Sequence, residues 1–256
     1  MSSSSQNPLN MKPDPFDGKS FILPETECTE ERKLFFKRMN EIQTLLFTTK
    51  HSYDICGKEY RNLIPNLPSK ETTPIKFEIN ACNFIIVPAS QILKLTTNGI
   101  GILTRQAFIM FYGSFETYLF QLCERSFPLV GVNDNILDKS REILSGKPWD
   151  GKFCGLSEIF SLGYKDSELS SRFKNFEMVF EEQKIKKPLQ LLDALAQVRH
   201  RIVHASSILE TGNLIFINID MFHSLFGFFF LLTDYVDNLF AKKFNYSRLK
   251  INPGEA

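Results

Sequence analysis

Residues 221–243 form the segment that most constrains the fold, because as a helix they are apolar on nearly every side. Phenylalanine and leucine side chains point around almost the whole axis instead of forming one stripe. Such a helix must be covered by several neighbouring helices or by a partner chain. Its most apolar run, MFHSLFGFFFLL, is too short to cross a bilayer, so we expect no membrane partner. The segment predicts a mainly α protein built as a helical bundle.

Further helices are expected where apolar residues recur at steps of three and four positions. The expected helices cover residues 25–48, 100–127, 134–145, 155–162, 166–183 and 188–204. Between residues 51 and 98 the signals are mixed. Prolines make NLIPNLPSKETTP a loop, and the β-branched and aromatic stretch IKFEINACNFIIVP, residues 75–88, predicts a strand that Pro88 ends. LIFINI, residues 214–219, is expected to be a short extended stretch.

The chain is expected to divide into four parts. Residues 1–20 are polar and rich in serine and proline, which predicts a disordered tail. Residues 21–98 form a helical and mixed N-terminal extension with the short strand. Residues 99–246 form the helical bundle, and residues 247–256 form a second tail.

Charge and cysteine content limit the functions that this chain can have. The formal net charge of +1 and the pI of about 7.6 provide no basic field over the whole protein, so a site for a polyanion has to be a local patch. The five cysteines are scattered, contain no CxxC pair and follow no signal peptide, which predicts reduced thiols and a cytoplasmic location. Without a G-x-S-x-G motif or a glycine-rich phosphate loop, the common hydrolases and nucleotide-driven enzymes are excluded.

The predicted helix 188–204 carries the residues that best indicate a function. Its apolar side chains form a narrow stripe widened into a broad arc, and Arg199 falls inside that arc. The stripe consists of Leu191, Leu195, Val198 and Ile202, and the residues that widen it are Leu189, Leu192, Ala196 and Val203. His200 and His204, four positions apart, share the edge of the arc. A guanidinium keeps its proton, so a buried Arg199 needs an anion. That anion is either Glu116, the one charged side chain in the apolar stretch 107–123, or the phosphate of a ligand.

Two other interpretations of these residues remain open at this point. Arg199 can be a structural arginine tied to a carboxylate, with His200 and His204 as ordinary surface histidines. The two histidines can also be metal ligands, because an H-x-x-x-H spacing places both imidazoles on one face of a helix. The chain has no further cluster of cysteine and histidine residues, and no glutamate follows His200 as in zinc proteases, so we expect no metal and no cofactor.

The stretch from Arg199 to His204 resembles the R-x4-H signature of the HEPN superfamily, the higher eukaryotes and prokaryotes nucleotide-binding domains. As in that family, the signature lies late in a helix, precedes a polar turn and is followed by one long apolar helix. The helix RQAFIMFYGSFETYLFQLCERSF, residues 105–127, is similar to the family's first helix, with Glu116 at a position that is often acidic or polar. The resemblance covers residues 99–244.

Membership would imply a bundle that dimerises with its two motifs facing each other. It would also imply metal-independent cleavage of RNA by a toxin or an antiviral defence effector, under the control of an antitoxin or other regulatory protein. In that case His204 is the main acid or base, Arg199 holds the phosphate, His200 is a second proton carrier and Glu116 positions Arg199. The alternative is a HEPN-like module without catalysis that binds RNA or another protein.

Overall fold

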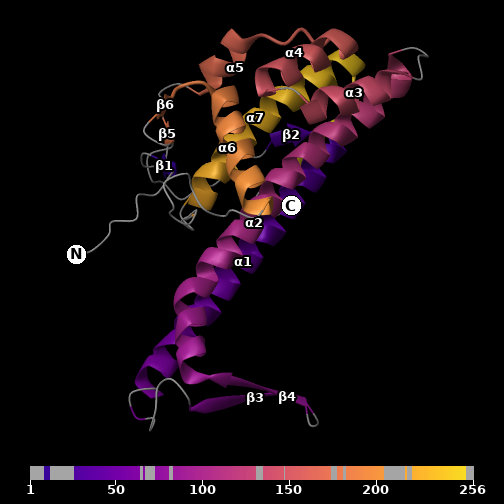
Figure 1. Cartoon of the computed structure of the whole chain (residues 1–256). Coiled ribbons are helices and arrows are strands. Elements are labelled where there is room, and N and C mark those ends of the chain that lie inside the picture. Colours follow the sequence, from indigo (N-terminus) through magenta and orange to yellow (C-terminus); the bar gives the residue numbers. More distant parts are fainter. Residues whose placement is uncertain are drawn as a thin grey trace. The chain divides into compact units, whose positions relative to one another are not determined.

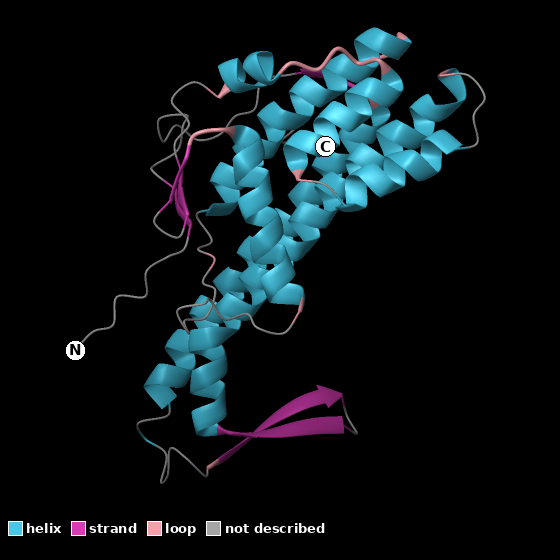
Figure 2. Cartoon of the chain, turned by 45° about the horizontal axis from the view of Figure 1, so that its top comes forward, coloured by secondary structure: helices cyan, strands magenta, loops and turns pink. Residues whose placement is uncertain are grey.

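The computed structural model describes residues 9–11, 26–63, 66, 73–80, 83–130, 135–146, 148–173, 178–180, 183–204, 217 and 221–251. The helices are α1 (Glu30–Leu63), α2 (Ala89–Ser126), α3 (Asn135–Gly146), α4 (Trp149–Phe160), α5 (Asp166–Arg172), α6 (Pro188–Val203) and α7 (Met221–Phe244), with a 3₁₀ turn η2 (Phe127–Leu129) (Figure 1). Strands are short and antiparallel, and helices dominate the described chain (Figure 2). The prediction of a mainly α fold is confirmed.

The strands among the described residues form three small sheets. β1 (Leu9–Met11) pairs with β5 (Met178–Phe180), which pairs with β6 (Gln183–Ile185); β2 (Thr26–Cys28) pairs with β7 (Leu249–Ile251); and β3 (Pro74–Asn80) pairs with β4 (Asn83–Pro88). The single strand predicted over residues 75–88 is therefore a hairpin, although Pro88 does end it. Both predicted tails are wrong where they include β1 and β7, because each of these strands gains hydrogen bonds from a partner far away in the sequence.

The contacts divide the chain into two compact units. One unit contains residues 1–42 and 108–256, and the other contains residues 43–107. Helices α1 and α2 each contribute to both units. The boundary predicted between residues 98 and 99 falls inside α2.

In the unit of residues 43–107, α2 begins at Ala89 and not at residue 100 as predicted. The helix continues through Gly99, which faces the ring of Tyr53 on α1. A Cβ atom at position 99 would lie 3.2 Å from that ring, so glycine permits this close approach. The same unit holds the C-terminal part of α1, which extends to Leu63 beyond the predicted end at residue 48.

In the larger unit, α7 lies at the centre of a cluster of aromatic rings. The ring centroid of Phe229 lies 4.9 Å from that of Phe115 and 5.7 Å from that of Phe111 on α2, and 6.4 Å from that of Phe35 on α1. Rings from other elements cover its other sides, namely Phe173 against Phe228 and Phe160 against Phe240. The prediction that several neighbours bury this helix is confirmed, and its own chain supplies them.

A buried polar group joins the beginning of α1 to α7. The fully buried Arg32 lies between the rings of Phe36 and Phe230, and its Nη1 is 2.8 Å from Oδ1 of Asp234. Thr29 caps α1, because its Oγ1 accepts a hydrogen bond from the backbone N–H of Arg32 at 3.4 Å. This cap explains why α1 begins at Glu30 and not at the predicted residue 25.

The other predicted helices agree with the structure to different degrees. Helices α3, α6 and α7 match their predicted ranges closely, whereas α4 begins six residues before the predicted residue 155, at Trp149. The helix predicted over residues 166–183 is wrong beyond Arg172, since β5 lies in its second half and β6 begins at its last residue. LIFINI lies outside the described residues except for Ile217, which is buried. No helix in the described part of the chain is long and apolar enough to cross a membrane.

Replacement of Phe115 by alanine tests whether the aromatic cluster determines stability. We expect Phe115→Ala to lower the free energy of unfolding by about 3–5 kcal/mol, because it leaves a cavity beside Phe229. Met110, on the same helix but 50% exposed, provides the control, and Met110→Ala should change stability by no more than about 0.5 kcal/mol. Urea denaturation of the three proteins measures both values. Equal losses in both variants would contradict the packing described here.

Candidate functional site

Helix α6 presents one buried apolar stripe to the core of the larger unit. It begins at Pro188, whose missing N–H costs nothing in the first turn of a helix. The members of the predicted stripe, Leu191, Leu195, Val198 and Ile202, are all buried. This part of the prediction is confirmed. Val203, expected to widen the apolar arc, is instead 50% exposed at the end of the helix.

Arg199 lies at the margin of this stripe and not deep within it, since its side chain is 40% exposed. Its Nη1 is 3.4 Å from Oε2 of Glu116 on α2, so the pair that the sequence suggested is formed. Its guanidinium carbon lies 5.8 Å from the ring centroid of Tyr112. The Nε of Arg199 is buried and has no hydrogen-bond acceptor among the described residues. Arg199 is therefore only partly satisfied by the protein.

The two histidines of the motif lie together at the C-terminal end of α6. Both are exposed, and their ring centroids are 4.4 Å apart at an interplanar angle of 44°. The backbone N–H of His204 donates to the carbonyl oxygen of His200 at 2.9 Å and closes the last turn of the helix. Because the two rings are neighbours, a group bound at one imidazole is within reach of the other.

A cavity of about 670 Å³ lies beside Arg199, within the larger unit. Its lining residues come from four helices, α2, α3, α4 and α6: Tyr112, Glu116, Leu144, Ser145, Lys152, Ala196, Gln197, Arg199, His200 and Arg201. The structure thus places three of the four predicted site residues, Glu116, Arg199 and His200, around one space. His204 is not a lining residue, but its ring contacts His200.

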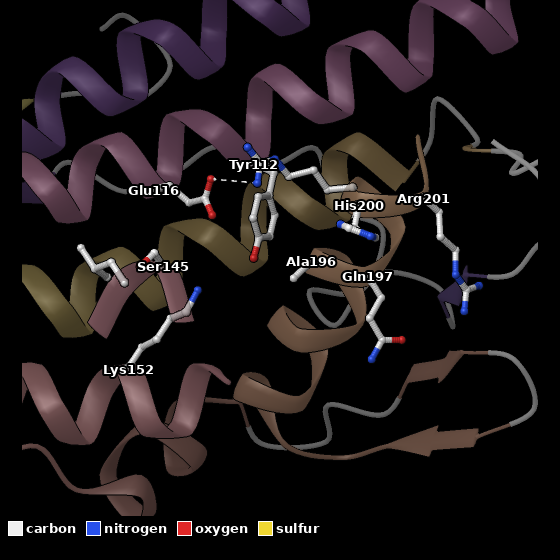
Figure 3. Close-up of a pocket in the computed structure, with 10 residues that line it drawn as sticks. Tyr112, Glu116, Ser145, Lys152, Ala196, Gln197, His200 and Arg201 are labelled. Atoms are coloured by element: carbon white, nitrogen blue, oxygen red, sulfur yellow. Dashed lines mark ion pairs between the residues drawn. The ribbon is translucent and has the colours of Figure 1, made fainter. Parts of the chain in front are cut away.

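Lys152 on α4 is a residue of this site that the sequence reasoning missed. It is only 8% exposed, and Figure 3 shows its amine pointing into the cavity toward Glu116 and Tyr112. Its Nζ lies 4.2 Å from the ring centroid of Trp149. The available signal was the helical spacing of Trp149, Lys152, Leu156 and Phe160, which places a lysine on an otherwise apolar face. The prediction began this helix at residue 155, after Lys152.

The charged groups around the cavity influence one another. Burial raises the pKa of the Glu116 carboxyl group, and the positive charges of Arg199 and Lys152 oppose this increase. Burial lowers the pKa of the Lys152 amine, while the carboxylates of Glu116 and Asp193 act in the opposite direction. Lys152 and Arg199 thus act on the Glu116 carboxylate from two helices, and Asp193 acts on Lys152 as a second carboxylate. The three cations among the lining residues, Lys152, Arg199 and Arg201, favour an anionic ligand.

Two hydrogen bonds hold α4 in place beside α2 and α6. The indole Nε1–H of Trp149 donates to the hydroxyl oxygen of Tyr112 at 2.8 Å, and both side chains are buried. The backbone N–H of Trp149 donates to Oδ1 of Asp193 on α6 at 2.9 Å, which satisfies a free donor at the start of α4. Because Lys152 lies one turn further along α4, these two bonds fix its position at the cavity.

The metal-ligand interpretation finds no further ligand in the described residues. No three histidine, cysteine, aspartate or glutamate side chains of that part of the chain lie close enough together to hold a metal ion. His200 and His204 remain a pair.

Comparisons with known proteins give no relative for this chain. Neither a family model, nor a curated protein sequence, nor a solved structure matches it. What the site does must therefore be argued from its own residues.

The bond between Tyr112 and Trp149 can be tested with a double-mutant cycle. Tyr112→Phe leaves the buried indole N–H without its acceptor, so we expect it to lower the free energy of unfolding by about 1–3 kcal/mol. Trp149→Phe removes the donor as well as part of the ring packing. The double variant should lose less stability than the sum of both, with a coupling of about 0.5–3 kcal/mol in chemical denaturation. Strictly additive losses would mean that the two side chains do not depend on each other.

Proposed function

We propose that this protein is a metal-independent endoribonuclease of the HEPN type that acts as a toxin or antiviral defence effector. The observation that carries the proposal is the arrangement at the end of α6. There, Arg199 and His200 line one cavity and the ring of His204 lies against that of His200. A phosphate clamp and two proton carriers are thus neighbours, and they match the R-x4-H signature in spacing.

The chemistry requires no nucleophile from the protein, because RNA carries its own in the 2′-hydroxyl group. One histidine accepts the proton of the 2′-hydroxyl as its oxygen forms a bond to phosphorus. The bond from phosphorus to the 5′-oxygen breaks, and a second imidazolium gives its proton to that oxygen. Arg199 holds the non-bridging phosphate oxygens and stabilises their growing negative charge. Glu116 positions Arg199 through their ion pair.

The proposal includes a homodimer, in which a second copy contributes its own histidines to the substrate. A partner chain was one of the two expected covers for the apolar helix α7, but its own chain buries most of this helix. Val203, which follows Arg199 and His200 on α6, is an apolar side chain that is 50% exposed. We therefore propose the surface at the end of α6 as the position of a second copy.

A second candidate is a module that binds RNA or a protein without catalysis. It is favoured by the ion pair that already engages Arg199 and by the net charge of only +1. A toxin that acts in the cytoplasm would in addition need an antitoxin or another regulatory protein to restrain it. Cleavage and binding assays with the same protein separate the two candidates.

Two substitutions test the ribonuclease directly. We expect His204→Ala to slow cleavage of total cellular RNA by at least about 100-fold, because it removes a proton carrier. Arg199→Ala should cost about 100-fold to 1,000-fold through the loss of charge stabilisation. Both assays contain an excess of chelator, and the readout is the rate at which full-length RNA disappears.

The matched control is His51→Ala, which removes an exposed histidine of α1 that belongs to the other unit and should leave the rate unchanged. Circular dichroism confirms that each variant is folded. If both site variants cleave RNA as fast as the unmodified protein, the assignment of these residues is wrong. If the unmodified protein binds RNA but never cleaves it, the non-catalytic module is correct.

A further inference from the structure

The position of Lys152 is unusual for a lysine. Its side chain is 8% exposed, whereas lysines almost never become fully buried unless they are paired. An ammonium group has three N–H donors and no acceptor. No hydrogen bond or ion pair to the Lys152 amine is formed within the described part of the chain; its close contact is the face of Trp149 at 4.2 Å. A cation–π contact stabilises the charge but forms no hydrogen bond with the three N–H donors.

The amine also points into the cavity that Arg199 lines. Figure 3 shows Lys152 extending from α4 toward Glu116, whose ion pair with Arg199 is the dashed line. The guanidinium of Arg199, whose side chain is 40% exposed, is the second cation at this cavity. Gln197 and Arg201 also line the cavity, although in Figure 3 their side chains do not point toward Glu116. Two cations from different helices, Lys152 of α4 and Arg199 of α6, therefore line one cavity of about 670 Å³.

We propose that this cavity is a phosphate-binding site in which Lys152 and Arg199 together hold one phosphate group of an RNA chain. A phosphate offers several acceptor oxygens and a negative charge, which are the two things that these donors lack. The lining residues carry more cations than carboxylates, because Lys152, Arg199 and Arg201 line this space with Glu116 alone, while Asp193 acts on Lys152 from outside the lining. The identity of the ligand as RNA rests on the proposed function. The new element is Lys152, which supplies the second cation of the site.

Lys152→Met separates a binding role of Lys152 from a structural role. Methionine retains the apolar length of the side chain but removes the charge. A buried cation without an ion pair is costly, so the variant should be at least as stable toward urea as the unmodified protein. A lysine that served only to stabilise the fold would give the opposite result, a loss of stability on substitution.

Binding is measured by fluorescence anisotropy with a labelled 2′-O-methyl oligoribonucleotide, which lacks the attacking hydroxyl group and is not cleaved. We expect Lys152→Met to weaken binding about tenfold, the loss of one charge-assisted contact. In a plot of log affinity against log salt concentration, the magnitude of the slope should fall by about 0.7, because one cation fewer contacts the RNA phosphate backbone. Lys152→Arg should restore most of the affinity. Lys242→Gln, at an exposed position of α7, is the control and should change neither value.

The outcomes distinguish this inference from the proposed function. If Lys152→Met binds the oligoribonucleotide as tightly as the unmodified protein, the inference is overturned, even where the protein cleaves RNA. A second arm uses inorganic phosphate as a ligand in calorimetry. If phosphate binds and Lys152→Met abolishes its binding while the oligoribonucleotide does not bind, the phosphate site is supported and the ribonuclease is not. If neither probe binds, the cavity is not a phosphate site.

Discussion

The burial of α7 is the constraint on which the rest of the larger unit depends. A helix that is apolar on nearly all sides can exist in water only when other elements surround it. Phenylalanines of α1 and α2 pack against Phe229. Phe173, directly after α5, packs against Phe228, and Phe160 of α4 packs against Phe240. The buried Arg32 also determines how α1 and α7 are aligned, because its ion pair with Asp234 requires one alignment of the two helices.

The site is a consequence of this packing. Helices α2, α4 and α6 meet beside the core, and Trp149 connects them through Tyr112 and Asp193. Their charged side chains are brought to the margin of an apolar region, where partial burial raises the pKa of Glu116 and lowers that of Lys152. Arg199, Glu116 and Lys152 thus surround one cavity although they come from three helices. The exposed histidines at the end of α6 lie where a large substrate can reach them.

Helix periodicity was sufficient to predict α3, α6 and α7 and the apolar stripe of α6, because tertiary packing follows the local pattern in these helices. It also led to the pairing of Arg199 with Glu116, since an arginine among leucines needs an anion. The pattern could not show that Gly99 lies inside a helix, because only the ring of Tyr53 explains a glycine there. Strands β1 and β7 depend on partners far away in the sequence. Lys152 was missed because its burial results from the contact of α4 with α2 and α6.

The chemistry of the ends that cleavage leaves on RNA tests the central claim most directly. Attack by the 2′-hydroxyl group on the neighbouring phosphate produces a 2′,3′-cyclic phosphate on one fragment and a 5′-hydroxyl on the other. The purified protein, incubated with RNA in an excess of chelator, should generate fragments with these two ends, identified by mass spectrometry. Fragments with 3′-hydroxyl and 5′-phosphate ends, or RNA that stays intact, would contradict the mechanism assigned to Arg199, His200 and His204.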